Sequence, residues 1–306
     1  MCALVRTSPM RYHDRAPFIP LPHRQRWRWP NGARLAVWVV PNVEYFEESS
    51  LTGTTIASVA HSAPDIPNFS WREYGLRVGI WRTMDALTRL DIPATVALNS
   101  DVCRYYPQVV DACLERGWEL MAHGRTNSEF LPGKSEHEER ALIGDVLAAI
   151  ERYSGRRPTG WLGSALAETA STPDILAEHG VRYVGDWVND EQPYPLHTAH
   201  GEIVAMPYSI EINDIGTFMR RGFTGPDYAQ MLLDQFSVLY DEAEHVAKVM
   251  CIALHPYITG VPFRALHLEA ALGTMRARSD VWFATGSQIL EAYRSATSAA
   301  SAAPTS

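Results

Sequence analysis

The sequence predicts an α/β fold in which about seven parallel strands form a barrel related to the (β/α)8 type, irregular or incomplete. Two observations lead to this class. Short runs of continuous apolar residues, typical of strands covered on both faces, recur along the chain. Longer segments with an apolar residue at every third or fourth position, typical of helices, separate these runs. A chain of 306 residues is long enough for one such domain.

The predicted strands are, in order, residues 33–40, 93–100, 118–123, a short strand near Trp161, 181–188, 202–208, 248–255 and 280–285. Helices are predicted at residues 76–90, 135–153, 227–245 and 286–294. The second of these begins with Ser135 followed by Glu138, the pattern of a capping box.

The two ends of the chain have a different composition. Residues 1–32 are rich in Pro, Arg and Trp without a sustained period, so we expect an extended arm that packs on the body or on a neighbouring subunit. Residues 33–295 form a single catalytic barrel domain in this interpretation. Residues 296–306 are small and polar, and we expect a disordered tail there.

Composition narrows the class of partner. The formal charge is −8 and no basic run is present, which argues against a nucleic-acid partner. No run approaches the about 18 apolar residues of a membrane span, and Arg6 is not followed by the apolar stretch of a secretory leader. The four cysteines form no C-x-x-C pair, as in proteins with reduced thiols. We therefore expect a cytoplasmic protein, off the membrane, with a small-molecule ligand.

Polar residues follow the predicted strands, where a barrel of this type places its active site. They are Asn42, Glu44, Asn99, Asp101, His123, Arg125, Trp161, Asp186, Asn189, Asp190, Glu211, Asn213, Asp214 and His255. These residues come from separate segments of the chain, yet parallel strands would bring their carboxyl ends to one mouth. We therefore expect one shared cavity there.

Four segments in register resemble the motifs of a known family. The segments are VVPNVEYFE, GWELMAHGRTN, GRRPTGW and IALHPYITG, and the family is the polysaccharide deacetylase superfamily. YVGDWVNDEQPY and MPYSIEINDIG are similar to segments of one branch, the deacetylase-type bacterial allantoinases and cyclic imide hydrolases. The resemblance covers about residues 30–294 and implies a deformed (β/α) barrel. It also implies a homo-oligomer, since members of this branch assemble in that way.

The resemblance assigns roles to particular positions. Asn42 stands where the metal-using deacetylases carry the base, Glu44 at the ligand carboxylate, and His123 and Asn127 at the two ligand histidines. His255 falls on the final motif, whose histidine is a general acid. Asparagine is a weak zinc ligand, because it brings neither charge nor a good nitrogen donor. We therefore favour a site without metal or other cofactor; the alternative is one divalent metal such as zinc, held by Glu44, His123 and Asn127.

The predicted activity is hydrolysis of a cyclic amide, either a cyclic imide or a ureide such as allantoin, by attack of water on a ring carbonyl. Glu44 or His123 would be the general base, the carboxylate if burial raises its pKa toward neutrality. His255 would protonate the departing nitrogen or support the oxyanion. Arg125 would bind a carbonyl oxygen or the carboxylate product.

The predicted substrate-binding residues are Asn42, Asp101, Asn127, Trp161 and Asp190. Two alternatives stay open. One is metal-dependent removal of an N-acyl group from an amino-sugar substrate. The other is a non-catalytic small-molecule binding protein on a degenerate scaffold, for which Asn42 and Asn127 are the evidence.

Overall fold

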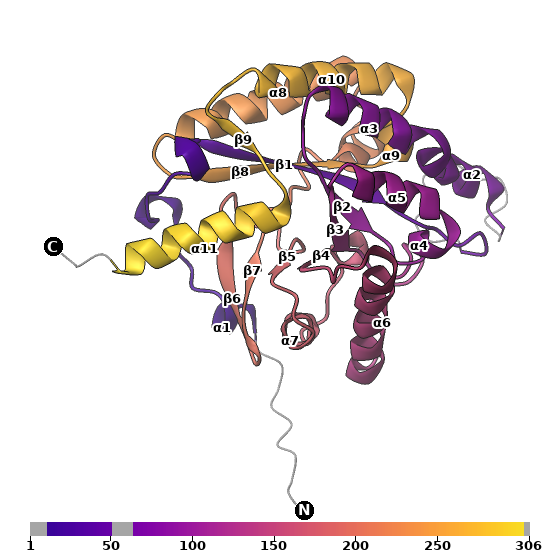
Figure 1. Cartoon of the computed structure of the whole chain (residues 1–306), viewed down its shortest axis with the longest axis horizontal. Coiled ribbons are helices and arrows are strands. Elements are labelled where there is room, and N and C mark those ends of the chain that lie inside the picture. Colours follow the sequence, from indigo (N-terminus) through magenta and orange to yellow (C-terminus); the bar gives the residue numbers. More distant parts are fainter. Residues whose placement is uncertain (1–10, 51–63, 303–306) are drawn as a thin grey trace, which may run out of the picture.

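The centre of the protein is one curled, mostly parallel sheet (Figure 1), seen here in a computed structural model that describes residues 11–50 and 64–302. The strand order is β6-β7-β5-β4-β3-β2-β1-β8, and β9 pairs with β1. The strands are β1 (Leu35–Val43), β2 (Thr95–Leu98), β3 (Glu119–Ala122), β4 (Gly160–Trp161), β5 (Tyr183–Val184), β6 (Tyr194–Thr198), β7 (Gly201–Ala205), β8 (Lys248–Leu254) and β9 (Val281–Phe283). Because β6 and β8 stand at opposite ends of this order, the sheet is a half-barrel.

The predicted α/β class is confirmed, with one correction to the sheet. Every predicted strand overlaps a strand of the structure, but β6 is additional and forms an antiparallel hairpin with β7. In β6 only Leu196 is buried, so this strand lacks the continuous apolar run by which the others were identified. The sheet of the described residues therefore has nine strands, of which β6 is antiparallel, where about seven parallel ones were expected.

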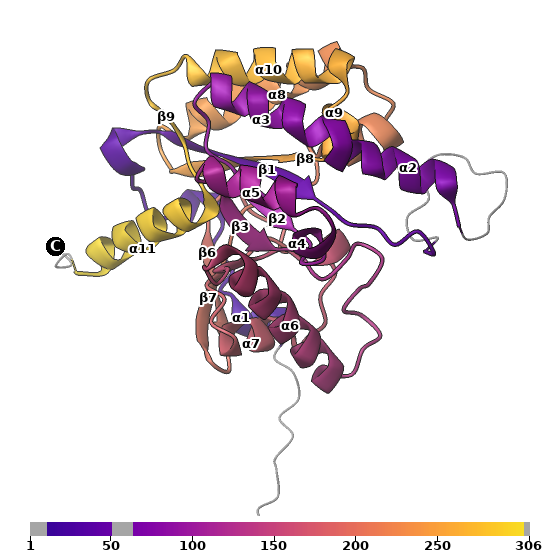
Figure 2. The same ribbon diagram turned by 45° about the vertical axis from the view of Figure 1, so that its right-hand side comes forward.

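Helices cover the outside of the sheet. They are α1 (Tyr12–Arg15), α2 (Ile66–Tyr74), α3 (Ile80–Arg89), α4 (Val102–Tyr105), α5 (Pro107–Glu115), α6 (Glu136–Ser154), α7 (Thr172–Glu178), α8 (Gly225–Glu242), α9 (Pro256–Thr259), α10 (Pro262–Arg276) and α11 (Gly286–Ala302). Helices α3, α8 and α10 lie together along one side of the sheet in both views (Figures 1 and 2). The four predicted helices correspond to α3, α6, α8 and α11, and the capping box of Ser135 and Glu138 is present at the start of α6.

Helices α2 and α3 are joined by a π-helical turn, Gly75–Gly79, that the sequence pattern did not predict. This turn lies against α9. A Cβ atom on Gly79 would stand 2.0 Å from the carbonyl oxygen of Pro256, and one on Gly75 would stand 2.8 Å from the backbone nitrogen of Tyr257. Only glycine permits this approach, so the turn fixes the segment that directly follows His255.

The prediction of a disordered tail from residue 296 is wrong for its first residues. Helix α11 continues to Ala302, and residues 303–306 lie outside the described part of the chain. The segment SATSAASA supplies four alanines, and alanine has the highest helix propensity of the amino acids. The helix therefore extends through residues 296–302, which we expected to be disordered.

The described part of the N-terminal arm packs on the body of its own chain. Arg15 is buried; its guanidinium pairs with Asp174 at 2.7 Å and donates to the carbonyl oxygens of Ala170 and His197. Further along, Arg24 forms a two-point ion pair with Asp190. Contact with a neighbouring subunit stays a prediction.

We expect Arg15→Met to lower the free energy of unfolding by about 3 kcal/mol, because it leaves Asp174 and two carbonyl oxygens without their buried cation. Urea denaturation measures this. Arg11→Met is the matched control, since Arg11 pairs with Asp14 on the surface and such pairs contribute little. Equal stability of the two variants would show that the arm is not anchored through Arg15.

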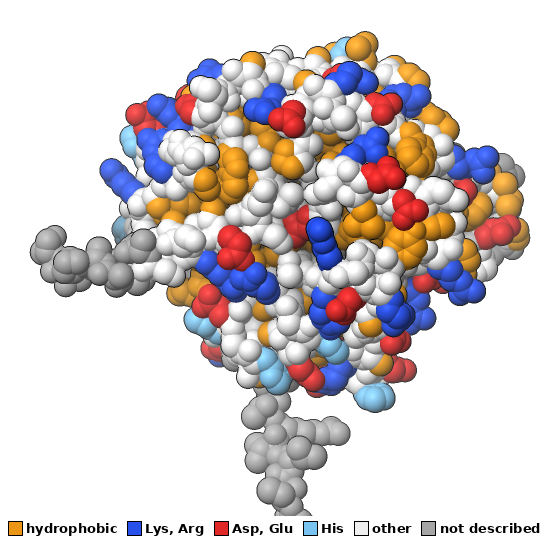
Figure 3. Space-filling model, viewed as in Figure 1, with side chains coloured by type: hydrophobic (Ala, Val, Ile, Leu, Met, Phe, Trp, Pro, Cys, Tyr) orange, Lys and Arg blue, Asp and Glu red, His pale blue; other side chains and the backbone are white. Residues whose placement is uncertain are grey.

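The distribution of charged side chains on the face in view agrees with the sequence, which contains no basic run. Figure 3 shows acidic and basic side chains interspersed over the face in view, without a large patch of one sign. In the described ranges, the structure contains no helix with both the length and the apolar character needed to cross a membrane.

Candidate active site

Glu44, His123 and His255 meet at one rim of the sheet. Each follows the last residue of a strand, β1, β3 and β8 respectively, and parallel strands end on the same side. Glu44 Oε1 lies 3.5 Å from His123 Nε2 and 3.5 Å from His255 Nε2. All three side chains are buried. The structure thus brings together three of the four residues predicted to be catalytic.

Glu44 is an anion at neutral pH. Asn127 donates its side-chain amide to Glu44 Oε1 at 2.5 Å, while Oε2 is buried and accepts no hydrogen bond from the described residues. Burial by itself raises the pKa of Glu44, but the positive charge of His255 and its hydrogen bond to the carboxylate outweigh it and lower the pKa to about 2. This corrects the expectation that burial would bring the pKa of this carboxyl toward neutrality.

His123 presents Nε2 to this carboxylate. Its Nδ1 lies 2.8 Å from the carbonyl oxygen of Leu162, which can only accept, so Nδ1 carries a proton. In the neutral ring the lone pair is then on Nε2, which is buried and has no hydrogen-bond partner in the described part of the chain. Two further donors, the hydroxyl of Ser164 and the amide of Asn99, bind the backbone carbonyl of His123. Ring and backbone are therefore both held in place.

His255 is held by Asp214. The ring Nδ1 lies 2.6 Å from Asp214 Oδ1, and the backbone N–H of His255 donates to Oδ2 at 2.6 Å. The hydroxyl of Thr259 also donates to Oδ2, at 3.0 Å. Burial favours the neutral ring, but the negative charges of Asp214 and Glu44 outweigh it and raise the pKa of His255 to about 10. His255 is therefore an imidazolium at neutral pH.

Asp214 was expected among the residues at the strand ends, but its role as the partner of His255 was not predicted. The sequence placed it after a predicted strand and inside the segment MPYSIEINDIG, but nothing in the spacing linked it to His255. The two residues are 41 positions apart, and only the tertiary structure joins them.

Arg125 does not join the cluster. Its side chain is exposed, and its Nε lies 3.4 Å from Glu129 Oε2 on the surface. We therefore assign Arg125 no role in the mechanism, although this residue stands only two positions after His123.

The predicted substrate-binding residues separate into two groups. Asn42 and Asn127 lie at the cluster: Asn127 contacts Glu44, and Asn42 donates to the carbonyl oxygens of Val40 and Leu254 at 3.2 Å each, which ties β1 to β8. Asn42 thus has a structural contact where a substrate contact was expected.

Asp101, Trp161 and Asp190 lie away from the cluster or are occupied by other contacts. Asp101 lines a cavity of about 540 Å³ next to the strand end of Glu44, formed with Tyr45, Glu47, Glu48, Ser49, Pro64 and Tyr105. Trp161 is fully buried in the core. Asp190 is bound by Arg24 of the arm and accepts two backbone N–H groups, so its predicted role in substrate binding is not supported.

The donors at this site fit a metal ion poorly. The amide nitrogen of Asn127 faces a carboxylate oxygen, and that of Asn42 faces two carbonyl oxygens, so both amides present donors where a cation needs acceptors. Across residues 11–50 and 64–302, no three His, Cys, Asp or Glu side chains are grouped so that they could hold a metal ion.

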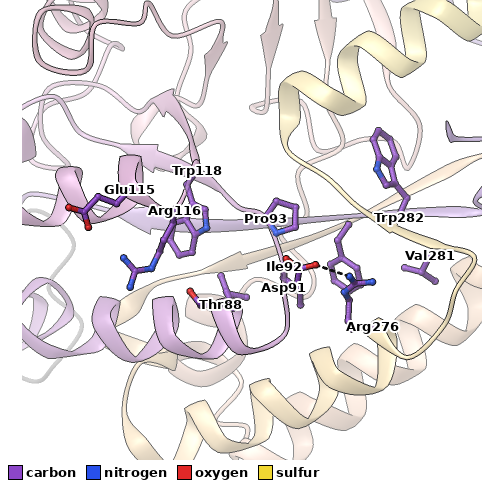
Figure 4. A pocket seen from close by; sticks show the side chains of 12 residues that line it. Thr88, Asp91, Ile92, Pro93, Glu115, Arg116, Trp118, Arg276, Val281 and Trp282 are labelled. Atoms are coloured by element: carbon purple, nitrogen blue, oxygen red, sulfur yellow. Dashed lines mark hydrogen bonds and ion pairs between the residues drawn. The ribbon is translucent and has the colours of Figure 1, made fainter. Parts of the chain in front are cut away.

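A cavity of about 640 Å³ opens at the other end of the sheet (Figure 4). Trp118 and Pro93, at the amino ends of β3 and β2, line it together with β9. Arg276 pairs there with Asp91, as the dashed line shows. This cavity lies at the rim opposite to Glu44, His123 and His255 and is separate from the candidate site.

The sequence of this chain is similar to those of polysaccharide deacetylases. The family model described as "Polysaccharide deacetylase" matches residues 73–184. A "Putative polysaccharide deacetylase" of Schizosaccharomyces pombe is 30% identical over 297 residues, which cover 87% of this chain and 92% of that protein.

Solved structures with a similar fold include members of the same family. A probable polysaccharide deacetylase from Pseudomonas aeruginosa PAO1 superposes with a TM-score of 0.80 at 27% identity, covering 94% of this chain and 98% of the other. The crystal structure of Puue allantoinase superposes with a TM-score of 0.78 at 26% identity and the same two coverages. This chain is a member of the polysaccharide deacetylase family.

Proposed function

We propose that the protein is a hydrolase that opens a cyclic amide, a cyclic imide or a ureide such as allantoin, by attack of water on a ring carbonyl. Family membership supports hydrolysis of a carbon–nitrogen bond as the general class of reaction. The similarity to Puue allantoinase supports a cyclic substrate. A cyclic imide needs little electrophilic help, because its second carbonyl withdraws electrons and its nitrogen is a good leaving group.

His123 is the general base in this mechanism. The pKa of Glu44, about 2, makes its carboxylate a weak base at neutral pH, since a general base works best with a pKa near the working pH. His123 offers a lone pair on Nε2 without a competing donor from the described residues. It takes a proton from water as the water oxygen bonds to the ring carbonyl carbon.

His255 is the general acid. Its imidazolium stabilises the negative charge that develops on the carbonyl oxygen, as a preorganised cation does in a buried site. When the ring carbon–nitrogen bond breaks, His255 gives its Nε2 proton to the departing nitrogen. His123 then releases its proton to solvent and His255 takes one up from solvent, so both rings regain their starting states and the net change is addition of one water across the bond.

Glu44 orders the two rings. Its Oε1 faces both imidazoles, and its Oε2, which no described residue binds, is an acceptor for the ring N–H of the substrate or for the attacking water. The observation that carries the proposal is this arrangement: one ring with a free lone pair and one charged ring, both held at Nδ1, converge on a single carboxylate oxygen.

A substrate panel tests this function. We expect purified protein treated with a chelator to open at least one ring among succinimide, hydantoin, dihydrouracil and allantoin, measured by loss of ring absorbance or by chromatography. Chitin oligosaccharides, which carry open-chain N-acetyl groups, should release no acetate. Acetate release that requires added zinc would replace the proposal by the deacetylase alternative, and inactivity on the whole panel would favour a non-catalytic binding protein.

The deacetylase alternative has one specific support. The relative from S. pombe carries the name putative polysaccharide deacetylase, and a peptidoglycan deacetylase from Helicobacter pylori is 22% identical over 248 residues. Asn42 and Asn127 argue against deacetylation. Both donate hydrogen bonds through their amide nitrogens, whereas metal-dependent deacetylation needs acceptor atoms at both positions.

A further inference from the structure

We propose that Asp186 is a positioning residue for His123: it fixes the loop that binds the imidazole, and its carboxylate stabilises the imidazolium that forms when His123 takes a proton from water. This inference rests on the proposed function. It adds to that mechanism one residue, Asp186, from a segment outside the cluster described above.

A chain of contacts leads from Asp186 to His123. Asp186 follows β5 and accepts the backbone N–H of Gly163 at 2.7 Å through Oδ1. Gly163 follows Leu162, whose carbonyl binds His123 Nδ1 at 2.8 Å. Ser164, the next residue, donates to the backbone carbonyl of His123 at 3.2 Å. Asp186 therefore holds the middle of the three-residue loop whose two other members hold His123.

The packing around Gly163 leaves no room for a side chain at this position. A Cβ atom there would stand 3.0 Å from Asp186 Oδ2 and 2.8 Å from the carbonyl oxygen of Ala167. Any side chain at this position would displace either the carboxylate or the loop. Gly163 is therefore required for the close approach of Asp186 to the backbone.

Asp186 has a second carboxyl group, that of Glu168, as its neighbour. Glu168, from the segment after β4, hydrogen-bonds to Asp186, although Asp186 Oδ2 and Glu168 Oε1 are both buried and no N–H or O–H group of another described residue reaches them. Two carboxyl groups can bond only if one of them carries a proton. Burial and the charge of Asp186 raise the pKa of Glu168, so the proton is on Glu168 and the negative charge is on Asp186.

Asp186 and His123 are also coupled electrostatically. Burial raises the pKa of Asp186 to about 6, and the positive charge of His123 acts in the opposite direction, so the two groups are near enough to influence each other. Such coupling is mutual: a carboxylate favoured by the imidazolium favours the imidazolium equally. The carboxylate of Asp186 therefore interacts favourably with the positive charge that His123 gains when it takes a proton from water.

The other charged groups around the pair belong to several elements. Arg15 from the arm and Glu139 from α6 act on Glu168 with opposite signs. His123 itself also faces Glu44, with His255 beyond it. Because these groups are unchanged in the variants below, differences among the variants report on Asp186 and Glu168.

The test compares Glu168→Gln with the double variant Asp186→Asn, Glu168→Gln. In the single variant the glutamine amide replaces the donor of Glu168 and the charge stays on Asp186. In the double variant the introduced asparagine still accepts from Gly163 through its amide oxygen, but the charge is gone. We expect the single variant to retain kcat within about 3-fold, and the double variant to lose about 10-fold in kcat with KM unchanged.

A spectroscopic readout separates positioning from simple structural support. In the double variant the ¹⁵N chemical shifts of the His123 ring, measured by NMR at one fixed pH without substrate, should differ from those in the Glu168→Gln variant, because the charge near the ring is lost while the contact with Gly163 is kept. Unchanged ring shifts in a folded double variant would refute the role of Asp186. This measurement needs no substrate, so it decides the point even if the protein opens no ring, in which case the proposed function fails alone.

Discussion

Replacement of His123 by Gln is expected to lower kcat for ring opening by about 10³-fold while KM changes little, since a general base contributes about 10²–10⁴-fold. Gln keeps a donor for the carbonyl of Leu162 but has no basic nitrogen to put in place of Nε2. Steady-state kinetics on the best substrate of the panel measures the change.

The control for this experiment is His245→Gln, on an exposed residue remote from the cluster, which should leave kcat as it is. If His123→Gln loses less than about 10-fold, the base lies elsewhere. In that case Glu44→Gln would have to show the large loss, and the assignment of the base would pass to the carboxylate in spite of its low pKa.

Replacement of His255 by Gln is expected to lower kcat by about 10²-fold and to change the pH profile, because the acid is lost. Wild-type activity should persist across neutral pH and fall as the pH rises through about 10, where His255 loses its proton. The alkaline limb should be absent in the variant. A limb of the same shape in both proteins would mean that another group is the acid.

The same residue links stability to pH. The pKa of His255 is raised from its ordinary value of 6.5 to about 10 on folding, so its contribution to stability is fully present below pH 6.5 and is lost as the pH rises through about 10. The free energy of unfolding should therefore fall more steeply over this interval in wild type than in His255→Gln. His137→Gln, on the exposed start of α6, is the matched control.

Sequence patterns located the residues of the site because of one physical rule. Apolar runs marked the strands, and parallel strands end on the same rim. His123 and His255 each end such a predicted run, and Glu44 stands shortly after another. This rule predicts at which rim of the sheet a residue lies, but it does not predict in which direction the side chain points. Arg125 satisfies it as well as His123 does, yet its guanidinium pairs with Glu129 on the surface.

The order of residues along the chain was thus enough to determine the fold class, the family and three members of the cluster, since these depend on local apolar patterns and on motifs read directly from the sequence. The protonation of those members was decided only by tertiary contacts. Glu44 is anionic because the charged ring of His255 lies beside it, and His255 is cationic because Asp214, 41 residues away, binds it. A pKa depends on burial and on neighbouring charges, and both exist only when distant segments have packed together.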